Sequence, residues 1–86
     1  MKVEAKAYKL QEKKNSLVGF GSIVIDDEFT VKDIAIMEGS NGLFITFPSK
    51  KDAKAENGYS NVAYPITKES RELITEKVLL AYRSLI

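Results

Sequence analysis

The sequence predicts an α+β fold, an antiparallel sheet of about five strands followed by one C-terminal helix. Polar and apolar residues alternate over most of the first 47 positions, which is the pattern of half-buried strands. Asn41-Gly42 lies between two such segments and is a strong hairpin signal. Apolar residues return with helical spacing near the C-terminus. With 86 residues, the chain is expected to form a single domain, 1–86.

The first two strands are expected at residues 2–10 and 17–25, joined by a polar turn at 11–16. In the first, Val3, Ala5 and Ala7 fall on one face. The second contains Gly19 and Gly21. Glycine inside a strand indicates a bulge or a close approach of another element.

The third strand is expected at 29–37, and its alternation slips near Lys32-Asp33, where we predict a β-bulge. The fourth strand, 43–47, follows the Asn41-Gly42 turn. It is apolar at both parities, so we expect both of its faces to be buried.

Pro48 ends the fourth strand and is followed by a polar loop at 49–58. A short fifth strand is expected at 59–66, confined to an edge or an end by Pro65. Thr67 is the expected N-cap of a helix over about 68–85. The apolar stripe of this helix is wider than one sheet face requires, which predicts dimerisation through helix and sheet.

Composition excludes several classes of function. The chain has no cysteine and no histidine, so disulfides, thiolate metal sites and imidazole bases are absent. We expect a non-enzyme with no cofactor and no metal. The longest apolar stretch, 78–82, is too short to span a bilayer, and the N-terminus lacks the apolar run of a signal peptide, which predicts a cytoplasmic protein without membrane contact.

Charge is unevenly distributed although the net charge is only +1. Residues 1–14 carry five lysines against two glutamates, and residues 26–38 carry five acidic side chains against one lysine. Residues 50–71 carry five basic side chains against three acidic ones. The basic segments are candidates for phosphate contact.

Three segments resemble the SpoVG family of bacterial septation and sporulation regulators. They are Ile25-Asp26-Asp27-Glu28-Phe29-Thr30-Val31-Lys32-Asp33, then Met37-Glu38-Gly39-Ser40-Asn41-Gly42-Leu43-Phe44-Ile45 running into Phe47-Pro48-Ser49-Lys50-Lys51, and Val62-Ala63-Tyr64-Pro65-Ile66 before the helix. The resemblance covers nearly the whole chain. It implies a dimeric regulator that binds DNA and, in some members, RNA. Tyr64 departs from the family pattern, in which a histidine or similar residue is expected, and the acidic tail of many members is not present after Ile86.

Six residues are the candidate nucleic-acid contacts. Lys50, Lys51 and Lys54 lie in the 49–58 loop, where mobile basic side chains suit phosphates, although a solvated loop explains them equally well. Lys68, Ser70 and Arg71 lie in the first helical turn, where free N–H groups favour anions. The simpler interpretation of that turn is an ordinary surface with Lys68 paired to Glu72.

Other charged and aromatic residues are assigned mainly structural roles. Lys2, Lys6 and Lys9 are more consistent with protection of an edge strand than with a basic surface. Asp26-Asp27-Glu28 is expected to be a solvated turn, since three adjacent acids supply too few converging ligands for a metal. The eight Tyr and Phe rings could serve as base-stacking platforms, but the aromatic and basic motif of an RNA-recognition sheet is absent. They are interpreted mainly as core and dimer contacts, with Tyr59, beside the basic loop, as the exception.

The leading hypothesis is therefore a homodimeric regulator that binds preferred DNA sites, with RNA as a further partner, and takes no small-molecule substrate. The alternative is a protein-interaction module of the division machinery, which would bind a partner through a free sheet edge or the acidic 26–38 surface.

Overall fold

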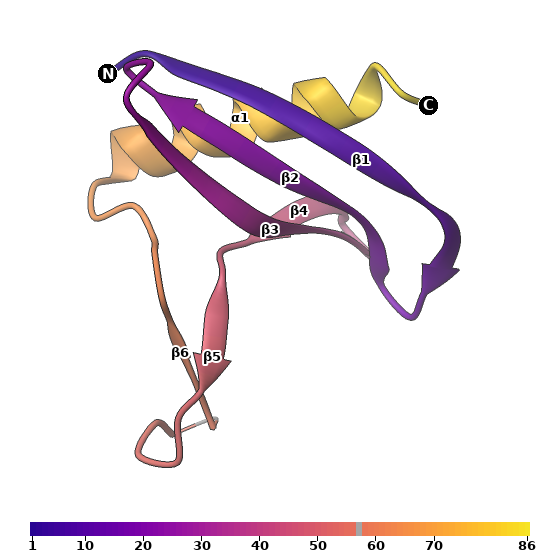
Figure 1. The fold of residues 1–86 in the computed structure, drawn as a ribbon. Coiled ribbons are helices and arrows are strands. Elements are labelled where there is room, and N and C mark those ends of the chain that lie inside the picture. Colours follow the sequence, from indigo (N-terminus) through magenta and orange to yellow (C-terminus); the bar gives the residue numbers. More distant parts are fainter. Residues whose placement is uncertain (57) are drawn as a thin grey trace.

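A four-stranded antiparallel sheet, a separate two-stranded hairpin and one helix make up the computed structural model, which describes residues 1–56 and 58–86 (Figure 1). The elements are β1 (Val3–Lys14), β2 (Leu17–Ile25), β3 (Phe29–Gly39), β4 (Gly42–Thr46), β5 (Ser49–Lys51), β6 (Tyr59–Asn61) and α1 (Lys68–Arg83). Strand order in the larger sheet follows the sequence, β1-β2-β3-β4, and β5 pairs with β6. The α+β class with one C-terminal helix is confirmed.

Helix α1 covers one face of the larger sheet, which we call the helix face (Figure 1). Gly21 marks this face, because a Cβ atom built there would lie 2.9 Å from Val78 Cγ1 of the helix. The close approach predicted for the glycines of β2 is thus confirmed. The buried core consists of Val3, Val18, Ile23, Ile34 and Ile36 from the sheet and Ile74, Val78, Leu79 and Tyr82 from the helix.

The turns and the bulge of the sheet follow local sequence signals. Asp33 adopts a φ of 63° where the pairing of β2 with β3 shifts register, which confirms the bulge predicted near Lys32-Asp33. Gly39 pairs with Gly42, so a tight turn does join β3 to β4, but its two central residues are Ser40-Asn41, one position before the predicted Asn41-Gly42. Strand β1 continues to Lys14, into the segment 11–16 predicted as a turn, because Lys14 still pairs with Leu17.

Strand β4 departs from the prediction that both its faces are buried. Phe44 is 44% exposed, and the neighbouring positions Gly42 and Thr46 on the same face are exposed too. Only Leu43 and Ile45 turn toward the core. The reason is that the described part of the chain has a single helix, which covers only one side of the sheet. We call the uncovered side the open face.

The segment predicted as a loop at 49–58 and a strand at 59–66 is organised differently. Ser49–Lys51 forms β5 and pairs with β6 through Ser49–Asn61, Lys50–Ser60 and Lys51–Tyr59. Residues 62–66 are not strand, although the Val62 N–H still donates to the Pro48 carbonyl at 2.7 Å. The resulting hairpin, residues 49–61, projects from the body (Figure 1), and we call it the arm. Asn57, within it, lies outside the described residues.

Thr67 caps helix α1 as predicted, since its hydroxyl accepts the Ser70 N–H at 3.1 Å. The helix begins at the predicted Lys68 and ends at Arg83, two residues before the predicted Leu85. Leu80 remains 62% exposed, so the apolar stripe does extend beyond the contact with the sheet. Within the described residues, α1 is too short and too polar to cross a membrane. Dimerisation through this surface stays a prediction.

Candidate nucleic-acid interface

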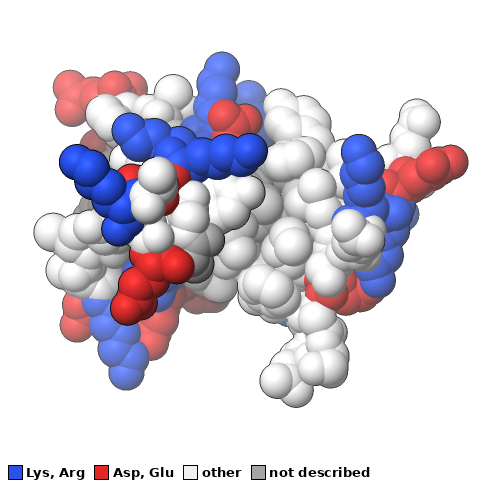
Figure 2. All heavy atoms as spheres, turned by 90° about the horizontal axis from the view of Figure 1, so that it is seen from below, with Lys and Arg blue, Asp and Glu red and all other residues white. Residues whose placement is uncertain are grey.

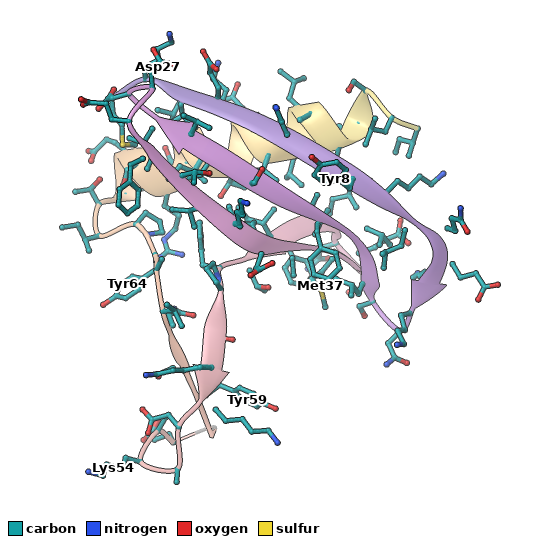
Figure 3. All side chains as sticks on the ribbon, in the orientation of Figure 1. Tyr8, Asp27, Met37, Lys54, Tyr59 and Tyr64 are labelled. Atoms are coloured by element: carbon teal, nitrogen blue, oxygen red, sulfur yellow. The ribbon has the colours of Figure 1, made fainter. Side chains whose placement is uncertain are left out.

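The arm presents the three predicted loop lysines on a two-stranded ribbon. Lys50, Lys51 and Lys54 are all exposed, with Lys54 at the tip and Tyr59 on the returning strand (Figure 3). Neighbouring residues of a strand point to opposite faces, so Lys50 and Lys51 lie on opposite sides of the ribbon. Lys51 is directly paired with Tyr59 and shares its face. The ribbon therefore offers a basic side chain on each face and an aromatic ring on one.

Asp52 organises the tip of the arm. Its N–H donates to the Gly58 carbonyl at 2.8 Å, and its carboxylate accepts the Lys54 N–H at 3.0 Å. An aspartate that accepts a backbone N–H two residues on forms an Asx turn, which stabilises a tight reversal of the chain. The position of Lys54 is consequently fixed by local backbone contacts rather than by packing against the body.

The start of helix α1 holds the other three predicted residues. Lys68 and Arg71 are exposed. The Ser70 hydroxyl is used in the helix cap, since it donates to the Thr67 carbonyl at 3.1 Å and accepts from the Thr67 hydroxyl at 2.7 Å. A structural role thus accounts for Ser70, and its contact with nucleic acid stays a prediction. The pairing of Lys68 with Glu72 is not among the ion pairs of the described residues.

Arg71 connects the helix start to the base of the arm. Its guanidinium carbon lies 5.8 Å from the centroid of the Phe47 ring, within the range of a cation–π contact. Phe47 is followed directly by Pro48 and the first arm strand. The sequence separates Arg71 from Lys50 by twenty residues, and only the fold shows that the two basic groups border the same connection.

Charges of both signs are interleaved on the side seen from below (Figure 2). Lysine and arginine side chains form two groups separated by uncharged residues, and acidic side chains adjoin each group. Within the described residues, this face of one subunit therefore carries separate small basic patches and no continuous positive stripe.

An apolar hollow of about 480 Å³ lies between the helix face, the segment 62–66 and the start of α1. The exposed residues around it include Phe29 at 63%, Val62 at 62%, Tyr64 at 55% and Ile66 at 88%. The sequence did not predict this hollow, because the alternation over 59–66 indicated one strand. The sequence does contain a signal for it, because Val62, Tyr64 and Ile66 are clustered in a segment that Pro65 interrupts.

Lys2 and the acidic turn neutralise each other. The Lys2 ammonium lies 3.1 Å from Asp27 and 3.3 Å from Glu4, and its backbone N–H donates to Asp26 at 2.7 Å. The hydrogen bond to Asp27, followed by Glu4, raises the pKa of Lys2 above its ordinary value. Across residues 1–56 and 58–86, no group of three or more acidic side chains is arranged to hold a metal ion. The turn at 26–28 is exposed, as expected.

Of the rings interpreted as core and dimer contacts, only two lie in or against the core of the subunit, and a role of the others in a dimer stays a prediction. Tyr82 is buried and Phe47 is half-buried. The other six rings are exposed, because they lie on the open face, on the arm or around the hollow; they are Tyr8, Phe20, Phe29, Phe44, Tyr59 and Tyr64. Alternation with polar residues indicated a strand correctly, but it does not say which face of that strand the helix covers.

Comparison with known proteins assigns the chain to a family. The model of the SpoVG family matches residues 1–84. Three relatives carry the name "Putative septation protein SpoVG". The protein of Agathobacter rectalis is 43% identical over 85% of this chain and 82% of its own length. That of Clostridium botulinum is 46% identical over 71% of this chain and 65% of its own length. That of Treponema denticola is 41% identical over 79% and 71%, respectively. The chain belongs to the SpoVG family.

Proposed function

We propose that the protein is a homodimeric nucleic-acid-binding regulator that binds preferred DNA sites, with RNA as a further partner, and affects septation, sporulation or related gene expression. The observation that carries the proposal is the arm, a projecting ribbon with Lys50, Lys51 and Lys54 exposed. A two-stranded ribbon fits the major groove of duplex DNA, where base edges are distinguishable. The lysines would contact phosphates, which fixes the orientation of the ribbon.

Arg71 supports a second contact at the base of the arm. Its position over Phe47 restricts the guanidinium without using its N–H groups. Lys68 lies on the same helical turn. The N–H groups at a helix start and the helix dipole also favour a phosphate there. Arm and helix start together would follow the backbone of one duplex segment.

The exposed apolar surface at the hollow supports the homodimer. Exposed apolar side chains surround the hollow, and Ile66, at 88% exposure, is the extreme case. Contiguous exposed apolar surface of this kind marks an interaction site in soluble proteins. Two copies would also bring two arms and double each basic group, which offsets the near neutrality of one subunit.

The test is a triple variant in which Lys50, Lys51 and Lys54 become Gln. Binding to labelled duplex DNA is measured by fluorescence anisotropy at several salt concentrations, and an electrophoretic shift against a pool of sequences reports site preference. We expect at least a tenfold loss of affinity and a smaller salt dependence, because phosphate contacts release counterions. The control is Lys77→Gln, which removes a charge from an exposed position of α1 away from the arm.

If the triple variant binds DNA with the affinity and the salt dependence of the parent, the arm lysines do not contact DNA. Arg71→Lys tests the helix start, because lysine keeps the charge but lacks the planar guanidinium. We expect it to weaken binding less than Arg71→Gln does.

The alternative function is a protein-interaction module without direct nucleic-acid binding. The free outer edges of β1 and β4 favour it, because an unpaired edge can add a strand from a partner. Purified protein that binds neither DNA nor RNA, but retains one defined partner from nuclease-treated extract, would favour this alternative.

A further inference from the structure

The open face of the sheet carries a cluster of exposed rings. Tyr8 pairs directly with Phe20 across β1 and β2, and Met37 pairs with Phe44 across β3 and β4. Directly opposed residues of antiparallel strands share a face. Tyr8 is 64% exposed, Phe20 39% and Phe44 44%. Tyr8 and Met37 lie on different strands of this one sheet (Figure 3).

Register and burial place these residues opposite the helix. Gly21 faces Val78 of α1, so its neighbours Phe20 and Ser22 point the other way. Ile36 is fully buried against the helix, so its neighbours Ala35 and Met37 also turn to the open face. The Phe44 ring lies over Gly39, 3.1 Å from where a Cβ of that residue would be. The absence of a side chain at Gly39 leaves room for the ring at this position.

Two lysines belong to the same face, one on the edge strand β1 and one on the inner strand β3. Lys6 pairs with Ser22, and Lys32 follows the inward-facing Val31, so both belong to the row next to Tyr8 and Phe20. Neither takes part in an ion pair within residues 1–56 and 58–86. Glu4, on this face, is engaged by Lys2 at 3.3 Å. Asp33, at the bulge, is the acidic group nearest to Lys32 in the chain.

We propose that the open face binds single-stranded nucleic acid, with bases stacked on Tyr8, Phe20 and Phe44 and the backbone held by Lys6 and Lys32. An exposed ring can stack on the π-face of any base, and lysines beside a row of rings suit the intervening phosphates. A four-stranded antiparallel sheet with exposed rings is an established way to hold two or three unpaired bases. The inference rests on the proposed nucleic-acid binding, but it uses a surface separate from the arm.

A second copy of the chain fits this face less well. Interface centres are depleted of charged residues, whereas Lys32 lies on the inner strand β3, within the open face. The hollow on the other side of the sheet is lined mainly by apolar residues, with no lysine among them. Charge complementarity therefore favours a polyanion on the open face and a protein surface at the hollow.

The first experiment measures binding of 12-nucleotide RNA and DNA single strands of one sequence, and of the matching duplex, to the parent, Tyr8→Thr and Phe44→Thr. Threonine keeps a strand-favouring side chain at these positions. We expect each variant to bind both single strands about 5- to 150-fold more weakly, the range for loss of one base–aromatic stack. Duplex binding should change by less than twofold. The matched control is Ile86→Ala, which removes an apolar side chain of similar exposure, 67%, beyond the end of the helix.

A second measurement separates stacking from general destabilisation. The chain has no tryptophan, so Tyr8→Trp introduces a single indole reporter. Its emission should be quenched when a single strand is added and should not respond to the duplex. Asp33→Asn removes the acidic group next to Lys32 while keeping a residue that tolerates the φ of 63°. This variant should bind single strands two- to fivefold more tightly.

The outcomes distinguish this inference from the proposed function. If Tyr8→Thr and Phe44→Thr bind single strands like the parent while the arm triple variant loses duplex binding, the open face is excluded and the regulator proposal stands. If the parent binds neither form, both proposals fail. If Tyr8→Thr instead converts a dimer into monomers without altering the affinity for single strands, the open face is a subunit contact and the inference is overturned.

Discussion

Gly21 allows helix α1 to pack directly on strand β2. A Cβ atom there would lie 2.9 Å from Val78 Cγ1, and Val78 is fully buried. At Gly19 on the same strand, a Cβ would meet the Tyr8 carbonyl oxygen and the Tyr82 ring. The sequence located both glycines and the need for close approach. It could not tell that the approaching element is the C-terminal helix, because that contact joins positions more than fifty residues apart.

The substitution Gly21→Ala is expected to destabilise the protein by about 1–3 kcal/mol, because the extra methyl group overpacks the contact with Val78. Urea unfolding followed by circular dichroism measures this free energy. Ser22→Ala is the control, since Ser22 faces away from the helix. An unchanged unfolding midpoint for Gly21→Ala would contradict the close packing described for this position.

The cap at Thr67 is the residue-level contact on which the start of helix α1 depends. Its hydroxyl accepts the Ser70 N–H and donates to the Ser70 hydroxyl. We expect Thr67→Ala to lower the free energy of unfolding by about 0.5–2 kcal/mol, whereas Thr67→Ser should be close to the parent. Equal effects of alanine and serine in thermal unfolding would show that the hydroxyl makes no net contribution.

Elements with an apolar face were predictable, and the arm was not. Strands β1 to β4 and helix α1 bury alternating or helically spaced side chains, and periodicity identified all five. Strand β5 is Ser49-Lys50-Lys51, exposed at every position, so nothing in its side chains distinguishes it from a loop. Its pairing with β6 depends on backbone groups, which every sequence has.

The arm should be dispensable for folding. Ser49 and Asn61 are directly paired, so residues 50–60 can be replaced by Asn-Gly to close a two-residue hairpin. We expect the shortened chain to unfold cooperatively, with a free energy of unfolding within about 1 kcal/mol of the parent, since loop length contributes only weakly. Duplex DNA binding should be lost. Loss of cooperative unfolding would mean that the arm belongs to the core.

At the scale of the whole molecule, the proposed homodimer would set the electrostatics of the proposed nucleic-acid binding. A dimer carries six arm lysines, two copies of Lys50, Lys51 and Lys54. If each contacts one phosphate, the slope of log affinity against log salt concentration should fall by about 5 in the triple variant. Equilibrium anisotropy titrations at several salt concentrations measure this slope. A fall of about 3 would indicate that only one arm of the dimer engages the DNA.

The dimer itself can be tested at the hollow. Ile66 is 88% exposed, so Ile66→Ser should leave the subunit folded while removing apolar contact from the proposed interface. Sedimentation equilibrium should then show a dissociation constant raised at least tenfold. The parent's melting temperature should increase with protein concentration, as expected for linked folding and association. A parent that sediments as a monomer at high concentration would exclude the dimer.

The separation of the arm from the sheet bears on how such a protein can diversify. Within the described residues, β5 pairs only with β6 and β6 only with β5. Substitutions in the arm are therefore constrained mainly by the partner that the arm binds, and little by the stability of the fold. Selection can therefore alter its length and side chains between species while the sheet and helix stay fixed. Exchange of arms between relatives is expected to transfer target preference, with no accompanying changes in the core.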